Sequence, residues 1–109
     1  FLRYMPEKLN SFGMSVINEI RKVLNEEPSF VSLEGYDAIH LLAKIINLYG
    51  VDRNSISESW SLVTLNGTRG EIKLSKSSKM NLWQWQEAPI QVVDRNPINQ
   101  NEFRVLYAK

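Results

Sequence analysis

The residues whose types could do acid–base or metal chemistry are few, and their spacing favours structural roles. His40 is the only histidine, and no set of partner ligands stands at a useful spacing from it for a metal site. Asp37 lies near the start of an apolar segment, where a carboxylate suits the positive end of a helix dipole. Glu26 and Glu27 are adjacent at a predicted helix end, so their side chains diverge and form no acid–base pair.

Motifs for nucleophilic or phosphate chemistry are absent from the sequence. The chain has no cysteine, which excludes disulfides, thiolate metal sites and cysteine nucleophiles. It contains neither a Gly-x-Ser-x-Gly elbow that would activate a serine nor a Gly-x-x-x-x-Gly-Lys loop that would cradle a phosphate. We therefore expect no enzymatic activity, no metal and no cofactor.

Aromatic and cationic residues are interleaved in the C-terminal half, a combination that occurs in proteins that bind single-stranded nucleic acids. They are Trp83 and Trp85 together with Arg69, Lys73, Lys76 and Lys79. However, the formal net charge is only +1, whereas affinity for phosphates grows with the number neutralised. No RNP-type motif is present either. We favour the interpretation that the tryptophans pack against helices and the lysines protect exposed strand edges, and we expect no nucleic-acid partner.

Three features bear on where the protein acts. Asn66-Gly67-Thr68 is an N-glycosylation sequon in a predicted turn, which gives weak support to an extracytoplasmic surface. No apolar run approaches the ~20 residues that span a bilayer. The sequence begins at Phe1 without a visible signal peptide, so we expect the natural N-terminus to lie further upstream.

The segment 34–50 organises the predicted elements, because it is apolar around nearly its whole circumference. Such a helix must be covered on more than one side, and a chain of 109 residues offers few partners for it. We expect a helix at 33–49, with Ser32 as its N-cap and Gly50 as its C-cap. The shortage of partners indicates that the chain is part of a larger assembly.

The remaining pattern predicts one α/β unit over 1–109, with helices in the first half and strands in the second. An amphipathic helix at 11–24 ends before Pro28. A short helix at 55–63 begins with a capping box formed by Ser55 and Glu58. The segment 65–70 has the composition of a turn. Strands are expected at 70–74, 81–87, 90–94 and 102–107.

The order of these motifs resembles the C-terminal third of the type I periplasmic binding proteins, the branched-chain amino-acid receptor family of ABC importers. A Gly-Tyr-Asp-Ala sequence at 35–38 opens the long apolar helix, and Leu-x-Gly-x-x-Gly-x-Ile at 65–72 leads into the strands. The resemblance covers roughly 12–107 and rests on the order and spacing of the motifs. Leu65 stands where that family commonly has an aromatic residue.

The resemblance implies a C-terminal fragment of a fold with two α/β lobes, which close on a ligand between them. The implied function is an extracytoplasmic solute-binding receptor, in the periplasm or at the cell surface. It would bind an amino acid or a similar small polar solute and present it to the membrane permease of an ABC importer. The residues that would contribute to the cleft lie just before the central helix: Phe30, Val31 and Ser32. An apolar residue there would line a pocket for an aliphatic side chain, and the helix N-terminus would favour an anionic group.

Two other functions remain open from the sequence. One is a ligand-sensing domain of a signalling receptor on the same fold, which transmembrane and signalling segments elsewhere in the gene would distinguish. The other is a small stand-alone interaction module, which stable folding as a soluble monomer would favour. For the receptor we expect no solute binding by this chain alone, because half of the cleft would be missing. We also expect exposed apolar surface and self-association.

Overall fold

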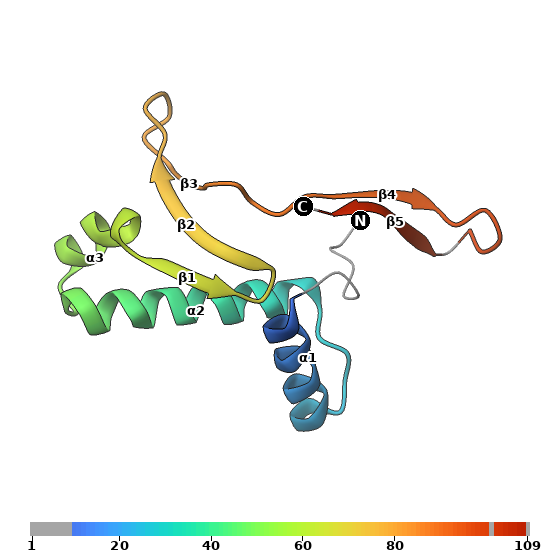
Figure 1. Cartoon of the computed structure of the whole chain (residues 1–109). Coiled ribbons are helices and arrows are strands. Elements are labelled where there is room, and N and C mark those ends of the chain that lie inside the picture. Colours follow the sequence, from blue (N-terminus) through green and yellow to red (C-terminus); the bar gives the residue numbers. More distant parts are fainter. Residues whose placement is uncertain (1–9, 101, 109) are drawn as a thin grey trace.

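The computed structural model describes residues 10–100 and 102–108, and it shows a mixed α/β chain of three α-helices and two small antiparallel sheets (Figure 1). The helices come first and the strands follow, as the sequence indicates. The elements are α1 (Ser11–Leu24), α2 (Phe30–Tyr49), α3 (Arg53–Ser59), the 3₁₀ turn η2 (Trp60–Leu62), β1 (Thr64–Gly67), β2 (Gly70–Lys76), β3 (Trp83–Trp85), β4 (Gln91–Arg95) and β5 (Phe103–Ala108).

The helix ends follow the capping rules, but two of the predicted caps are wrong. The side chain of Asn10 caps α1 by accepting a hydrogen bond from the N–H of Gly13, and Gly50 closes α2 as expected. The N-cap of α2 is Ser29, whose hydroxyl oxygen accepts from the N–H of Ser32 at 3.2 Å. Ser32 is therefore a residue of the first turn, and the helix begins at 30 rather than at 33.

The cap of α3 also lies earlier than the predicted capping box. Asp52 precedes the helix, and its carboxylate accepts from the N–H groups of Asn54 and Ser55. Ser55 thus lies inside the first turn, and α3 begins at Arg53. A carboxylate is a strong N-cap because it satisfies free N–H groups and suits the helix dipole.

The strands form one sheet in the order β1-β2-β3 and a separate pair β4-β5, both antiparallel. The segment 65–70 is not wholly a turn, because β1 pairs with β2 from Thr64 opposite Lys73 to Gly67 opposite Gly70. The turn itself is Thr68-Arg69, and Gly70 continues from it at φ +131°, a conformation that favours glycine. β4 and β5 extend away from the rest of the chain as a hairpin (Figure 1).

Two apolar clusters lie on the covered side of α2. Leu41 and Ile45 of α2 pack with Val63 and Ile72, and Trp85 packs against this cluster. Near the other end of α2, Leu33 packs with the buried residues of α1, Val16 and Ile17. The predicted cover on more than one side is not found within the described residues, since Ile39 on the opposite side is 66% exposed.

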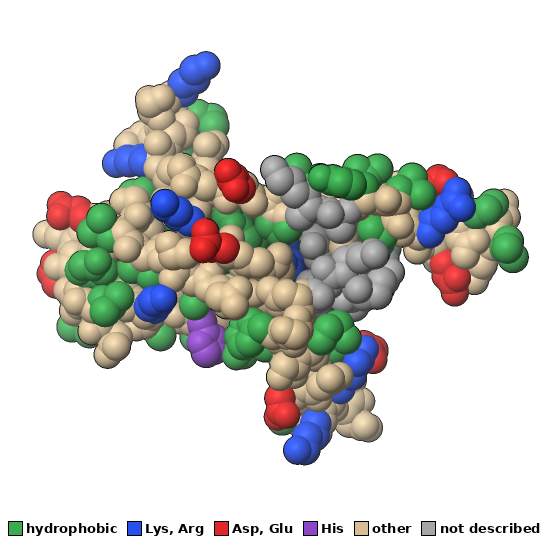
Figure 2. Space-filling model, viewed as in Figure 1, with side chains coloured by type: hydrophobic (Ala, Val, Ile, Leu, Met, Phe, Trp, Pro, Cys, Tyr) green, Lys and Arg blue, Asp and Glu red, His purple; other side chains and the backbone are tan. Residues whose placement is uncertain are grey.

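Apolar side chains also reach the surface elsewhere. Figure 2 shows hydrophobic groups over the α3 end of the molecule and along the β4–β5 hairpin, with acidic and basic groups intermixed. Val51, Leu62, Ile90 and Val92 are exposed in these regions. None of the helices in the described residues combines the length and the apolar character that a membrane span requires.

Candidate functional site

The site is built on a buried contact between α2 and the turn of the β1–β2 hairpin. Asp37 is 3% exposed and Thr68 is fully buried. The backbone N–H of Thr68 donates to the Asp37 carboxylate at 2.9 Å, and the Thr68 hydroxyl donates to Oδ2 at 2.7 Å. A buried carboxylate is stable when its oxygens accept such hydrogen bonds. Asp37 thus attaches the hairpin to the helix. The sequence predicted a position near the N-terminus of the helix, where a carboxylate suits the dipole, but α2 begins at Phe30 and Asp37 lies in its third turn.

Gly67 allows the hairpin to come this close. A Cβ at this position would lie 2.7 Å from Cδ1 of Ile72 and 3.0 Å from Oδ2 of Asp37. Both distances are tighter than ordinary van der Waals contact, so a side chain would push the hairpin away from α2. The side-chain amide of Asn10 also donates to the Gly67 carbonyl at 3.1 Å, which joins the start of α1 to the same turn.

Arg69, the other residue of the turn, connects three elements. Its guanidinium lies 3.1 Å from the carboxylate of Glu34 in α2 and 5.3 Å from the ring centroid of Trp85 in β3. The indole N–H of Trp85 donates to the carbonyl of Glu71 at 2.9 Å. The position of Trp85 is therefore fixed by an ion-paired cation on its ring and a hydrogen bond at its edge.

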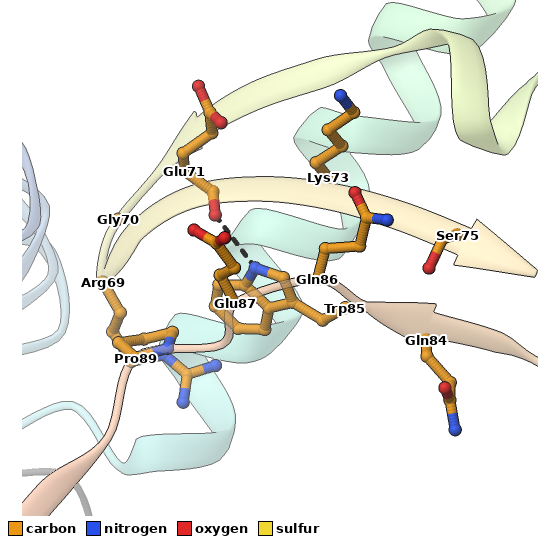
Figure 3. Close-up of a pocket in the computed structure, with 10 residues that line it drawn as sticks. All are labelled: Arg69, Gly70, Glu71, Lys73, Ser75, Gln84, Trp85, Gln86, Glu87 and Pro89. Atoms are coloured by element: carbon orange, nitrogen blue, oxygen red, sulfur yellow. Dashed lines mark hydrogen bonds between the residues drawn. The ribbon is translucent and has the colours of Figure 1, made fainter. Parts of the chain in front are cut away.

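Beside this turn the structure has an open hollow of about 790 Å³ (Figure 3). Its lining is about equally polar and apolar in surface, and combines two cations, two carboxylates, two side-chain amides and a hydroxyl with one indole: Arg69, Gly70, Glu71, Lys73, Ser75, Gln84, Trp85, Gln86, Glu87 and Pro89. The volume lies in the range of small-molecule sites. The charges of the lining balance, and its side chains offer both hydrogen-bond donors and acceptors.

The residues predicted to contribute to a ligand cleft lie elsewhere. Phe30, Val31 and Ser32 form the first turn of α2, and neither Val31 nor Ser32 lines the hollow. Val31 is 70% exposed and Ser32 is also exposed. The side chain of Phe30 lies outside the described residues. Sequence reasoning missed the hollow, although the outward positions of the predicted strands, such as Gln84 and Gln86, were a usable signal.

The histidine and the aromatic–cation pairs have local partners. His40 is exposed, and its ring lies 4.3 Å from that of Tyr36. Among the residues that the structure describes, no group of His, Cys, Asp and Glu is placed to hold a metal ion. The Lys76 ammonium lies 5.9 Å from the ring centroid of Trp83, so this lysine contacts an aromatic ring of the next strand.

Both motifs of the family resemblance meet at the site. The Gly-Tyr-Asp-Ala sequence supplies Asp37, and the Leu-x-Gly-x-x-Gly-x-Ile sequence supplies Gly67 and Ile72. Comparison with protein-family models, with curated proteins and with solved structures found no match to this chain.

Proposed function

We propose that this chain is part of an extracytoplasmic solute-binding receptor of an ABC importer. The observation that carries the proposal is the hydrogen bonding between Asp37 and Thr68, which lie 31 residues apart in the sequence. It joins the two sequence motifs of the resemblance directly. The helix and the hairpin then form one stiff unit, which is what a lobe needs in order to move as a body during closure.

The first turn of α2 is the place where this unit would touch a solute. The backbone N–H groups at the N-terminus of the 20-residue α2 favour a carboxylate or another anionic group. Val31 stands beside them and is 70% exposed, so its side chain is available to pack against an aliphatic group. An amino acid offers both groups. The opposite wall of the cleft would come from the other lobe.

The receptor would work by a shift between open and closed states. A solute that touches both lobes binds the closed state more tightly, so its differential affinity drives closure. The closed form would then be recognised by the membrane permease. This chain alone supplies one wall, so we expect it not to bind free amino acids by itself.

Calorimetry on the longer receptor that carries this segment tests the proposal, with a panel of free amino acids and small polar solutes as titrants. Wild type should bind at least one of them. Val31→Asp should weaken that binding tenfold or more, because it places a carboxylate beside the bound anionic group. Val51→Asp is the matched control, since Val51 is 80% exposed and follows α2 at its other end.

The outcomes separate the two parts of the proposal. If no solute binds the longer receptor, the receptor function is wrong. If a solute binds and Val31→Asp leaves its affinity unchanged, the first turn of α2 is not part of the cleft. Tight binding of a free amino acid to this chain alone would contradict the requirement for a second lobe.

A further inference from the structure

The loop that joins β2 to β3 projects from the body of the molecule and ends in exposed apolar residues (Figure 1). We call residues 76–83 the β2–β3 finger. Met80 is 58% exposed and Leu82 is 57% exposed. Backbone hydrogen bonds close the loop, from the N–H of Ser77 to the carbonyl of Leu82 at 2.8 Å and from the N–H of Asn81 to the carbonyl of Ser77 at 3.0 Å. The finger therefore has a defined backbone that holds two apolar side chains in water.

The charge around this apolar end is of one sign. Between Glu71 and Glu87 the sequence has three lysines and no acidic residue. The chain has 13 basic residues in all, so the remaining ten are outnumbered by the 12 acidic ones. Lys76 and Lys79 belong to the finger and are exposed, and Figure 2 shows basic and hydrophobic groups together at this projecting end. This concentration of positive charge favours an anionic partner.

Trp83 lies at the base of the finger, beside one of its lysines. It is paired with Lys76 at the end of the β2–β3 ladder, and the Lys76 ammonium lies 5.9 Å from the centroid of its ring. The indole is partly exposed. An indole combines a large apolar surface with a polar N–H, which suits the boundary between hydrocarbon and water. The finger thus combines apolar side chains, cations and an amphipathic ring in one short segment.

We propose that the β2–β3 finger is a contact site for the surface of a lipid bilayer that contains anionic lipids. The ammonium groups of Lys76 and Lys79 attract the anionic headgroups. Met80 and Leu82 then leave water and enter the boundary between headgroups and acyl chains. This contact goes beyond the proposed receptor function and does not depend on it.

The shape and chemistry of the finger favour a bilayer over other anionic partners. A projecting tip needs a matching groove in a protein partner, whereas a fluid bilayer adapts to the tip. A single-stranded nucleic acid would bind the cations and stack on tryptophan rings, but it would leave Met80 and Leu82 in water. A bilayer covers the apolar tip and neutralises the lysines in the same contact.

The small number of side chains sets the expected strength. A single myristoyl chain gives an association constant of about 10⁴ M⁻¹ with bilayers, and Met80 and Leu82 bury less hydrocarbon than such a chain. We therefore expect weaker, reversible binding that is measurable at millimolar lipid. It should weaken further as added salt screens the lysines.

Co-sedimentation with vesicles tests the charged part of the contact, with the whole protein that carries this chain. Wild type should bind vesicles of phosphatidylcholine and phosphatidylglycerol, and bind those of phosphatidylcholine alone much less. Lys76→Gln with Lys79→Gln should weaken binding to the anionic vesicles roughly 30-fold, about fivefold for each lysine. Lys22→Gln with Arg53→Gln is the matched control, because it removes the same charge from exposed positions in α1 and α3. It should bind as wild type does.

The apolar tip is tested separately with both lysines kept in place. Met80→Ser with Leu82→Ser should weaken binding to the anionic vesicles about tenfold, because less hydrocarbon is buried. Val51→Ser with Leu62→Ser is the matched control, since these residues are 80% and 64% exposed and lie outside the finger. Lipids with brominated acyl chains should quench tryptophan fluorescence in wild type and quench it less in Trp83→Phe. The thermal unfolding midpoint shows that the serine variants are folded.

Several results would overturn the proposal. They are a wild type that does not sediment with anionic vesicles at low salt, equal binding to neutral and anionic vesicles, equal binding by a finger variant and its control, and unchanged quenching in Trp83→Phe. Tighter binding of a single-stranded oligonucleotide than of anionic vesicles at the same salt would instead assign the lysines to a nucleic acid. Solute titration without vesicles tests the receptor function by itself, so the two proposals fail independently.

Discussion

The carboxylate of Asp37 accepts hydrogen bonds from both the backbone N–H and the hydroxyl of Thr68. This contact sets the position of the β1–β2 hairpin on α2. Thr68 is followed by Arg69, whose guanidinium lies over Trp85. The placement of the hollow beside β3 thus depends on a carboxylate in the second helix. Thr68 and Arg69 are neighbours in one turn, and together they connect α2 with β3.

Replacing the carboxylate should be costly. Asp37→Ala leaves the N–H and the hydroxyl of Thr68 buried without their acceptor, and each unsatisfied group costs about 1–3 kcal/mol. We expect the free energy of unfolding in urea to fall by about 3 kcal/mol. Glu58→Ala is the control, because it removes an exposed carboxylate of α3 and should change the stability by about 0.5 kcal/mol or less. Equal losses would show that Asp37 does not fasten the hairpin.

A double-mutant cycle isolates the hydroxyl part of this contact. Thr68→Val keeps the shape and the backbone N–H but removes the hydroxyl that donates to Oδ2. The coupling between Asp37→Ala and Thr68→Val should be about 1.5–3 kcal/mol, the range for hydrogen bonds to charged groups. Additive losses in urea unfolding would mean that the hydroxyl makes no direct contribution.

Two glycines should respond to alanine in opposite directions. Gly67→Ala should destabilise the chain by about 1–3 kcal/mol, since its Cβ would meet Ile72 and Asp37. At Gly35, in α2, a Cβ meets nothing within 4 Å. Gly35→Ala should therefore stabilise the helix by about 0.5–1 kcal/mol. Thermal unfolding at low protein concentration measures both, and a neutral Gly67→Ala would contradict the close approach of the hairpin.

The sequence was sufficient to predict the helices, because their signals are local. The apolar spacing within α1 and α2 and the glycine after Tyr49 mark where these elements lie and end. The caps were harder, because Ser29 and Ser32 are both good N-cap residues and the choice depends on the entry of the chain into the helix.

The hairpin contact could not be predicted from local signals. β1 has only four residues, and Asn66-Gly67 has the composition of a turn, so the segment reads as a loop. It becomes a strand because Gly67 lies against Asp37 and pairs with Gly70. The hairpin also explains why the predicted role of Asp37 at the helix dipole is wrong. The Asp37 carboxylate is buried and accepts hydrogen bonds from Thr68 instead. Tertiary contacts of this kind override local propensity.

The indole N–H of Trp85 offers a separate test of the site. Trp85→Phe keeps an aromatic ring for Arg69 but loses the hydrogen bond to the carbonyl of Glu71, so it should cost about 1 kcal/mol in urea unfolding. Trp83→Phe is the matched control on the same strand, and it keeps a ring for Lys76. We expect its cost to be about half as large or less. A larger loss for Trp83 would contradict the role given to Trp85.

The β4–β5 hairpin should respond to acid through one carboxylate. The pKa of Asp94 lies below its ordinary value, mainly because the Arg104 side chain donates a hydrogen bond to it at 2.9 Å, with the backbone of Arg95 as a second donor. A lowered pKa in the folded state means that the contribution to stability is complete above about pH 4. It is lost as the pH falls through the folded pKa, because protonation removes the negative charge that Arg104 binds.

Carbon-13 NMR of the Asp94 carboxyl group measures this pKa directly. Arg104→Gln should raise it towards the ordinary value, whereas Arg95→Gln keeps the backbone donor and should change it little. An equal rise in both variants would assign the shift to general charge rather than to the hydrogen bond across the hairpin.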